Sequence, residues 1–132
     1  MAGNWFGRFL GDRGERAAVR YLKQHRYQIL ARQYRTELGE IDIIALDQET
    51  VVFVEVKTRK STAKGQPFES VTGQKQKQLT RLAGVFLKKH GLLKHPARFD
   101  VISILWQTEQ KQPEIQHFQN AFPPAGDFQF FI

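Results

Sequence analysis

The stretch GEIDIIALDQETVVFVEVK, residues 39–57, decides the fold of this chain. It contains two runs of apolar residues separated by a short polar connector around Gln48 and Glu49. Such runs on either side of a polar connector predict two strands, 40–46 and 50–57, joined as a β-hairpin. Charged side chains continue these core-facing strands, and burying them is costly unless something compensates their charge.

The register of the hairpin decides which charged side chains meet. Directly paired residues of an antiparallel hairpin lie on one face of the sheet. A loop of two or four residues therefore places Asp42 opposite Glu55 and Glu40 opposite Lys57. We expect Glu40 and Lys57 to pair, with a supporting acid behind the site as the alternative role of Glu40. An odd-length loop would move Asp42 to the other face. The connector has no glycine, which disfavours a tight turn, so we expect a four-residue loop.

Asp42 and Glu55 form a candidate cation site. Opposed side chains have Cβ atoms roughly 4.5–5.5 Å apart, so two carboxylates in this register can bind one ion. Mg²⁺ prefers oxygen ligands, including one or two carboxylates, and keeps waters that a substrate can replace. The backbone carbonyl of Val56, next in the chain, adds a further oxygen. The alternative interpretation is a solvated strand end where both acids simply pair with Lys57.

Lys57 lies two residues after Glu55 and therefore on the same face of the strand. Near a metal ion it would stabilise the negative charge of a reacting phosphate or help to deprotonate an attacking water. A pKa near the usual lysine value of about 10.4 makes it a poor base at neutral pH. We therefore expect the electrostatic role unless the surroundings lower the pKa of Lys57.

The other elements follow from hydrophobic periodicity. Helical spacing predicts a first helix with Asp12 as its N-cap, or one that starts earlier, near Asn4. The elements expected outside the hairpin are 12–24, 27–34, 70–89, 99–106 and 115–120. The resulting order, α-β-β-β-α-β-β, implies an α/β fold with a central mixed β-sheet flanked by helices.

The composition fits one domain, expected at 1–122, followed by an aromatic tail at 123–132. The net charge of +7 favours polyanionic partners, with nucleic acid ahead of anionic membranes. The absence of cysteine excludes disulfides, thiol nucleophiles and cysteine zinc sites. Apolar runs are too short to span a membrane, and Asn4, Gly7 and Arg8 do not fit a signal peptide. We expect a cytoplasmic protein that binds nucleic acid and no membrane.

Five short sequence signatures are distributed along the chain. They are Gly14-Glu15 with Ala18, Tyr21 and Leu22; Gly39-Glu40-Ile41-Asp42; Phe53-Val54-Glu55-Val56-Lys57-Thr58-Arg59; Val71 with Lys75 and Leu79; and Arg98-Phe99-Asp100-Val101. Together they resemble the YraN family of small bacterial proteins, which is similar to archaeal Holliday junction resolvases. Asp42, Glu55 and Lys57 also resemble the core motif of the PD-(D/E)XK nuclease superfamily, with Ile41 replacing the usual proline. The resemblance implies a restriction-endonuclease-like fold, metal-dependent nuclease activity and, because resolvases act as dimers, a homodimer.

Two residues on the predicted helices are candidates to approach the acid pair. Glu15 stands in line with Ala18 and Leu22 and so faces inward. The resemblance implies that such a first-helix glutamate approaches the metal, whereas the alternative is a capping box with Asp12. Lys75 lies on the apolar face near the start of its helix. It is placed to reach a phosphate or to extend along the helix end into solvent.

Basic side chains around these elements are candidates for nucleic-acid binding. Arg59 follows the acid–lysine motif and suits bidentate phosphate contact, with generic basic surface as the alternative. The other candidates, besides Lys75, are Lys60, Lys64 and Lys77. Asp100 is expected to organise structure, and the spacing of the histidines does not predict a metal site.

Three functions are compatible with this sequence. The first is a metal-dependent endonuclease that uses Mg²⁺ or Mn²⁺ to hydrolyse phosphodiester bonds in DNA, including branched or flapped DNA. The second is a nucleic-acid-binding protein on a nuclease fold, without catalysis. The third is an interaction protein that docks through its aromatic segment 122–132.

Overall fold

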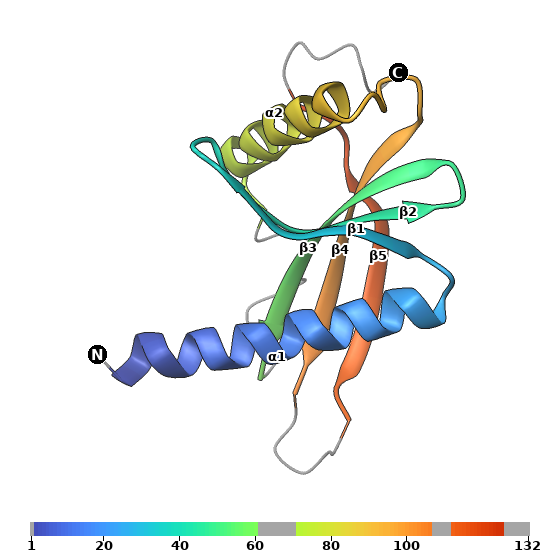
Figure 1. The fold of residues 1–132 in the computed structure, drawn as a ribbon. Coiled ribbons are helices and arrows are strands. Elements are labelled where there is room, and N and C mark those ends of the chain that lie inside the picture. Colours follow the sequence, from blue (N-terminus) through green and yellow to red (C-terminus); the bar gives the residue numbers. More distant parts are fainter. Residues whose placement is uncertain (1, 61–70, 107–111, 126–132) are drawn as a thin grey trace.

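The computed structural model describes residues 2–60, 71–106 and 112–125, with residues 2–10 described by their backbone only. They form a five-stranded sheet with one helix on each side (Figure 1). The elements are α1 (Ala2–Gln24), β1 (Gln28–Thr36), β2 (Gly39–Asp47), β3 (Thr50–Arg59), α2 (Gly73–Lys89), β4 (Ala97–Leu105) and β5 (Glu114–Phe122). This order confirms the predicted α-β-β-β-α-β-β arrangement.

The sheet is mixed, as predicted. Its strands lie side by side in the order β1-β2-β3-β4-β5. The β3–β4 pair is parallel, because α2 carries the chain back across the sheet between these strands, and the other three pairs are antiparallel. A parallel pair requires such a crossover connection.

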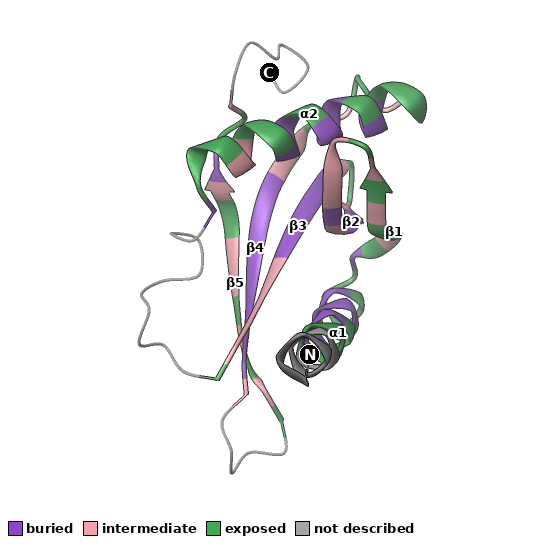
Figure 2. Ribbon diagram, turned by 90° about the vertical axis from the view of Figure 1, so that its left-hand side faces the viewer, coloured by how far each residue is buried: buried purple, intermediate pink, exposed green. Residues whose placement is uncertain are grey.

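The central strands are covered on both faces. On one face Phe53 and Phe99 pack against Phe86 of α2, and on the other Val52 and Val54 pack beneath α1. Figure 2 shows the buried residues concentrated in the first half of β3 and along most of β4. Burial on both faces explains why β3 is apolar at successive positions and does not alternate.

The hairpin has the predicted register but a shorter loop. Ile44 faces Phe53 and Asp47 faces Thr50, so the loop consists of Gln48 and Glu49 alone and not of four residues. The turn forms without glycine because Gln48 itself adopts a left-handed conformation, with a φ of 56°. An even-length loop preserves the faces on which the charged side chains lie.

Helix α1 begins near the earlier of its two predicted starts. It starts at Ala2, close to Asn4, so Asp12 lies within the helix and is not its N-cap. The capping-box alternative for Glu15 is therefore wrong. Helix α2 starts at Gly73, where the hydroxyl of Thr72 caps it by accepting a hydrogen bond from the N–H of Lys75 at 3.2 Å. Within the described residues, neither helix has the length and apolar character needed to cross a membrane.

The last residue of β5 and the short segment after it pack on the same domain. Phe122 is buried and its ring stacks on Phe99, with ring centroids 4.9 Å apart. The N–H of Ala125 then donates to the hydroxyl of Thr80 on α2 at 3.0 Å. The remaining tail, 126–132, lies outside the described residues, as does the proposed docking role of its aromatic side chains.

Candidate functional site

Asp42 occupies an interruption in the sheet. On one side, β2 pairs with β3 only as far as Ile43 and Val54. On the other side, the described β1–β2 ladder skips the position between its Arg32–Ile43 and Tyr34–Ile41 pairs, which is that of Asp42. The Oδ2 atom of Asp42 instead accepts a hydrogen bond from the N–H of Val56 at 2.8 Å. The carboxylate therefore lies in the gap where β2 separates from β3.

Glu55 is buried next to Asp42. Only 9% of the residue is exposed, and it lies on the α2 side of β3, on the same face as Phe53. Burial, followed by the negative charge of the adjacent Asp42, raises the pKa of Glu55 to about 8. Among the described residues, its Oε2 atom has no hydrogen-bond partner. The interpretation as a solvated strand end does not fit this burial.

Two lysines adjoin the acid pair. The Nζ atom of Lys75 lies 3.3 Å from Oε1 of Glu55, which connects α2 to β3. Half-burial and the nearby charge of Lys75 lower the pKa of Lys57, against the opposing influence of Glu55 and Asp42. A lysine with a lowered pKa can act as a base at a lower pH than usual, so the surroundings of Lys57 permit this role.

Glu15 approaches Asp42 from the other helix. It is 7% exposed on the inner face of α1, which confirms its predicted inward direction. Burial, followed by the charge of Asp42, raises the pKa of Glu15. Its Oε1 atom lies 3.6 Å from Nε of Arg32, and a hydrogen bond with Gln33 also involves its carboxylate. Asp42 is consequently flanked by an acid on each helix-facing side of the sheet.

Sequence reasoning missed Arg32 and Gln33. Both lie on β1, where the register shifts between Ile29 and Ala31. Gln33 has a φ of 50°, a left-handed conformation that a periodic strand pattern does not predict. This irregularity brings their side chains to Glu15. The only signal in the sequence is a strand that is mostly polar on both faces.

The donor set fits a cation held by two carboxylates. Asp42 and Glu55 supply hard oxygen ligands, and the unpartnered buried Oε2 atom of Glu55 is an acceptor that lacks compensation. Within the described residues, no three or more histidine and acidic side chains converge closely enough to hold a metal ion. A two-carboxylate site suits Mg²⁺, which retains water in its remaining positions. Glu15 interacts electrostatically with Asp42 and is not one of these two carboxylate ligands.

Close packing of α1 on β3 fixes the position of Glu15. A Cβ atom on Gly14 would lie 1.9 Å from Oγ1 of Thr58, so only glycine fits there without movement. Thr58 directly follows Lys57, and Gly14 directly precedes Glu15. This contact therefore joins the two elements that carry site residues.

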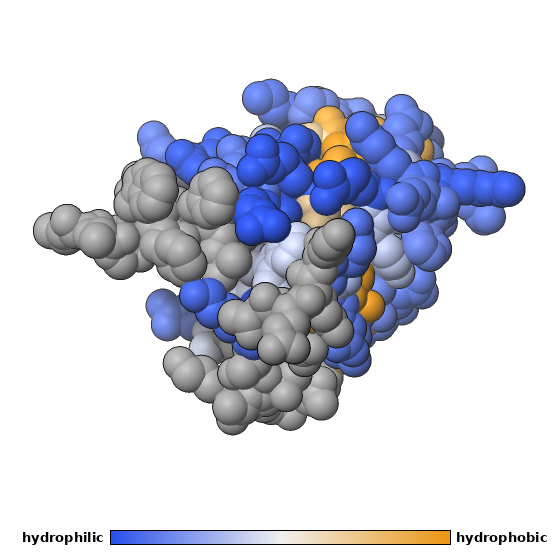
Figure 3. Space-filling model, turned by 90° about the horizontal axis from the view of Figure 1, so that it is seen from below, coloured by the Kyte–Doolittle hydropathy of each residue, from blue (hydrophilic) through white to orange (hydrophobic). Residues whose placement is uncertain are grey.

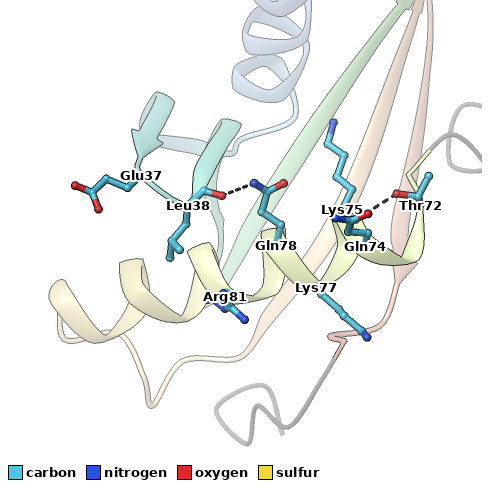
Figure 4. A pocket seen from close by; sticks show the side chains of 8 residues that line it. All are labelled: Glu37, Leu38, Thr72, Gln74, Lys75, Lys77, Gln78 and Arg81. Carbon is cyan, nitrogen blue, oxygen red and sulfur yellow. Dashed lines mark hydrogen bonds between the residues drawn. The ribbon is translucent and has the colours of Figure 1, made fainter.

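A basic groove lies beside the acid pair. It has a volume of about 590 Å³ and is lined by Glu37, Leu38, Thr72, Gln74, Lys75, Lys77, Gln78 and Arg81 (Figure 4). The side-chain amide of Gln78 donates to the carbonyl of Leu38, which ties the β1–β2 turn to α2. Gly39 completes this turn with a φ of 137°, a conformation that favours glycine.

The other predicted basic residues lie at the end of β3. Arg59 is half-buried, and its carbonyl accepts the N–H of Trp106 at 2.9 Å. Lys60 is exposed just beyond it, whereas Lys64 lies outside the described residues. The view from below in Figure 3 shows a largely hydrophilic described surface at this end of the molecule. Lys75 and Lys77 belong to the groove and not to this region.

Glu40 corrects one expectation. It lies opposite Arg35 of β1 and forms an ion pair with it at 3.3 Å, instead of pairing with Lys57. The reason is that β2 no longer pairs with β3 beyond Ile43. Glu40 therefore lies in the part of β2 that pairs only with β1, away from the site.

Asp100 has the structural role expected of it. It is fully buried and accepts hydrogen bonds from Nε of Arg98 at 3.1 Å and from the N–H of Asn120 at 3.0 Å. Its Oδ2 atom lies 2.7 Å from Nε2 of His117, whose Nδ1 contacts the hydroxyl of Tyr21 at 3.2 Å. This network joins α1, β4 and β5.

Comparison with known proteins relates this architecture to a family. A sequence model described as "Uncharacterised protein family UPF0102" matches residues 14–104. A UPF0102 protein of Geotalea uraniireducens (strain Rf4) is 51% identical over 116 residues, covering 88% of this chain and 91% of that protein. One of Geobacter metallireducens is 50% identical over 116 residues, covering 88% and 93%. One of Geobacter sulfurreducens is 44% identical over 123 residues, covering 93% and 95%.

Proposed function

Since the chain belongs to the uncharacterised protein family UPF0102, the YraN family, whose name states no activity, we propose its function from the site itself. The proposed function is hydrolysis of phosphodiester bonds in DNA with the help of Mg²⁺ or Mn²⁺. The observation that carries it is the buried Glu55 carboxylate, held against Asp42 with one oxygen unpartnered.

The acid pair destabilises the folded protein. Two carboxylates that share a site repel each other, and burial penalises their charged forms further. Lys75 and Lys57 offset this charge for Glu55 only in part, because its pKa stays raised. Strongly perturbed acids beside a groove are typical of functional sites. We therefore infer that the arrangement is kept for cation binding.

Asp42, Glu55 and the backbone of Val56 would hold the cation. The N–H of Val56 points to Asp42. The N–H and the carbonyl of an extended residue lie on the same edge of the strand, so the Val56 carbonyl also faces the gap. A divalent cation bound there would supply a Lewis acid for a phosphate oxygen and lower the pKa of a water.

Lys57 is the proposed proton acceptor. It shares a face of β3 with Glu55, and its lowered pKa increases the neutral fraction of its amine near physiological pH. In the neutral form, Nζ can take a proton from a water that attacks phosphorus. In the ammonium form, the same group stabilises the negative charge that develops on the phosphate.

The groove supports nucleic acid as the substrate. Lys75, Lys77 and Arg81 line it, and the chain as a whole carries a net charge of +7. Basic side chains that contact phosphates supply most of the non-specific affinity for DNA. The proposed DNA is branched or flapped, and the proposed assembly is a homodimer.

A cleavage assay with purified protein tests this function. Branched, flapped, nicked and single-stranded DNA are each incubated with Mg²⁺ or Mn²⁺. Asp42→Ala and Glu55→Ala should each lower the cleavage rate by about 10²-fold or more, the scale of losing a main electrostatic contribution. Glu40→Ala is the matched control, because it removes an acid of β2 that pairs with Arg35. Cleavage that survives unchanged in the first two variants would reject the site.

The basic groove alone also supports a second candidate, nucleic-acid binding without catalysis. Affinity that falls steeply with salt, together with no metal-dependent cleavage of any DNA tested, would favour this candidate. Binding that is absent or insensitive to salt would count against both functions.

A further inference from the structure

Lys75 contacts the acid pair and also lines the basic groove. Its ammonium group lies 3.3 Å from Oε1 of Glu55, yet its side chain also lines the basic groove with Lys77 and Arg81. Figure 4 shows Lys75 extending from α2 in a different direction from Lys77 and Arg81. It is therefore the residue that connects the acid pair with the groove.

We propose that Lys75 is a displaceable partner of Glu55. Before a divalent cation binds, its ammonium group contacts Oε1 of Glu55; when the cation binds, the ammonium group moves into the groove and contacts a nucleic-acid phosphate. The inference rests on the proposed function, because it assigns a cation to Asp42 and Glu55 and nucleic acid to the groove.

The side chain of Lys75 can leave Glu55 while its backbone stays in place. The side chain of Glu55 is 10% exposed, whereas that of Lys75 is 37% exposed. Lys75 lies in the first turn of α2, and the Thr72 hydroxyl holds its backbone N–H at 3.2 Å. The backbone is thus fixed while the flexible four-carbon side chain can change direction. Nζ can leave Glu55 without any movement of the helix.

Electrostatics make the two cations mutually exclusive at Glu55. A lysine ammonium and a divalent ion on one carboxylate would repel each other strongly at such short range. Lys75 already repels Lys57, since its charge is one cause of the lowered pKa of Lys57. A cation at Asp42 and Glu55 therefore favours the departure of Lys75.

The groove offers the displaced ammonium group a new partner. Lys77 and Arg81 already make this surface attractive to phosphates. A third positive charge, added only after the cation has bound, would couple metal binding to DNA binding. Linkage requires the coupling to act in both directions, so DNA should also strengthen cation binding.

The first experiment measures cation affinity without DNA. Mn²⁺ is titrated into wild-type protein, Lys75→Met and Lys77→Met by calorimetry. Lys75→Met should bind Mn²⁺ about fivefold more tightly, the size expected from removing a partly exposed competing ion pair. Lys77→Met removes the same charge two residues away and should differ from wild type by less than about twofold. Equal affinities in the two variants would overturn the inference.

The second experiment measures DNA affinity against salt concentration. A labelled DNA flap is bound in Ca²⁺ and again in EDTA. Each phosphate contact adds about 0.9 to the slope of log affinity against log salt. For Lys75→Met, the salt slope should fall by about that amount in Ca²⁺ and stay unchanged in EDTA. For Lys77→Met, the salt slope should fall by the same amount in both conditions. A loss in both conditions for Lys75→Met would show a permanent phosphate contact and contradict the displacement.

These measurements separate the inference from the proposed function. If wild-type protein binds no divalent cation, both fail together. If it binds Mn²⁺ but no tighter in Lys75→Met, only the inference fails. Should Lys75→Met not fold, lysine side-chain NMR of the wild-type protein provides the test. Addition of Mg²⁺ should shift the Lys75 ammonium signal towards that of a solvated lysine, and an unchanged signal would reject the displacement.

Discussion

The backbone N–H of Val56 donates a hydrogen bond to Oδ2 of Asp42 at 2.8 Å, just past the last β2–β3 pair. A side chain thus takes the donor at the point where the two strands separate. Without this bond the N–H of Val56, which has no β2 partner here, would be left unpaired in a partly buried position. The same bond fixes the Asp42 carboxylate beside Glu55 and prepares both acids for a common ligand.

The stability of the metal-free protein should fall between about pH 4.5 and pH 8. The pKa of Glu55 rises from the usual 4.5 to about 8 in the folded protein, so folding favours its protonated form. The stability due to that proton is complete below pH 4.5 and is lost as the pH rises through about 8. Urea denaturation in EDTA across this range should show the decline.

Glu55→Gln removes the titrating group and supplies the comparison for this pH dependence. Its stability should decline less over the same range, so that the variant is more stable than wild type above pH 8 by up to a few kcal/mol, since each pKa unit corresponds to about 1.36 kcal/mol. Mg²⁺ should stabilise wild-type protein at high pH and leave Glu55→Gln nearly unaffected. Parallel stability curves for the two proteins would contradict this assignment.

Lys57→Arg should distinguish a proton acceptor from a fixed positive charge. Arginine stays protonated in proteins and cannot accept the proton. If Lys57 takes a proton from water, the variant should lose about 10²-fold or more in cleavage rate, the usual contribution of general base catalysis. DNA affinity in Ca²⁺ should stay within a few-fold of wild type. Retention of most of the rate would assign Lys57 an electrostatic role alone.

Gly14→Ala should destabilise the protein although alanine favours helices. The added Cβ would lie 1.9 Å from Oγ1 of Thr58 and 3.1 Å from its Cγ2, so rotating the threonine does not clear the space. Overpacking of this kind costs about 1–3 kcal/mol. Differential scanning calorimetry should show a lower Tm, and displacement of the helix should weaken the influence of Asp42 on the pKa of Glu15.

Gly11→Ala is the matched control in the same helix. Nothing lies within 4 Å of a Cβ at this position. The substitution should therefore raise the unfolding free energy by about 0.5–1 kcal/mol through helix propensity alone. A stabilising effect at both glycines would show that α1 does not rest on Thr58 as described.

Asp100→Asn should be among the most destabilising single-atom changes in the molecule. It removes the negative charge shared by Arg98 and His117 while leaving the shape of the side chain unchanged. Breaking a buried ion pair costs about 3–5 kcal/mol. Chemical denaturation measures this loss, and Asp12→Asn on the exposed surface of α1 should change the stability by less than about 0.5 kcal/mol. A small effect at Asp100 would mean that the network contributes little net stability.

Much of the fold could be predicted from the pattern of apolar and polar residues along the sequence. The β2–β3 register followed from the parity of the loop, because Ile44 and Phe53 could meet only if the loop length was even. The exact loop length was wrong, since the left-handed conformation of Gln48 has no signal as clear as a glycine. The assignment of Asp12 as the N-cap of α1 was wrong because Asp12 matches a cap by composition, while the helix continues through it; the alternative start near Asn4 was nearly correct.

The site was less predictable than the fold, for a different reason. The proximity of Asp42 and Glu55 depends on two neighbouring strands, and counting along the hairpin anticipated it. The expected direct pair of these two residues does not form, because the β2–β3 ladder ends at Ile43 and Val54. The contact of Lys75 with Glu55 depends on how α2 crosses the sheet, which periodicity does not determine. Glu40 was misplaced because counting assumes that pairing with β3 continues past Ile43, where the strands in fact separate.

The separation of β2 from β3 has a structural consequence. Beyond Asp42, β1 and β2 continue as a two-stranded ribbon whose turn, with Leu38, rests on α2 through Gln78 (Figure 1). That turn forms one wall of the groove, and Asp42 lies at the base of the ribbon. One short ribbon therefore forms a wall of the groove at its turn and carries a carboxylate of the acid pair at its base.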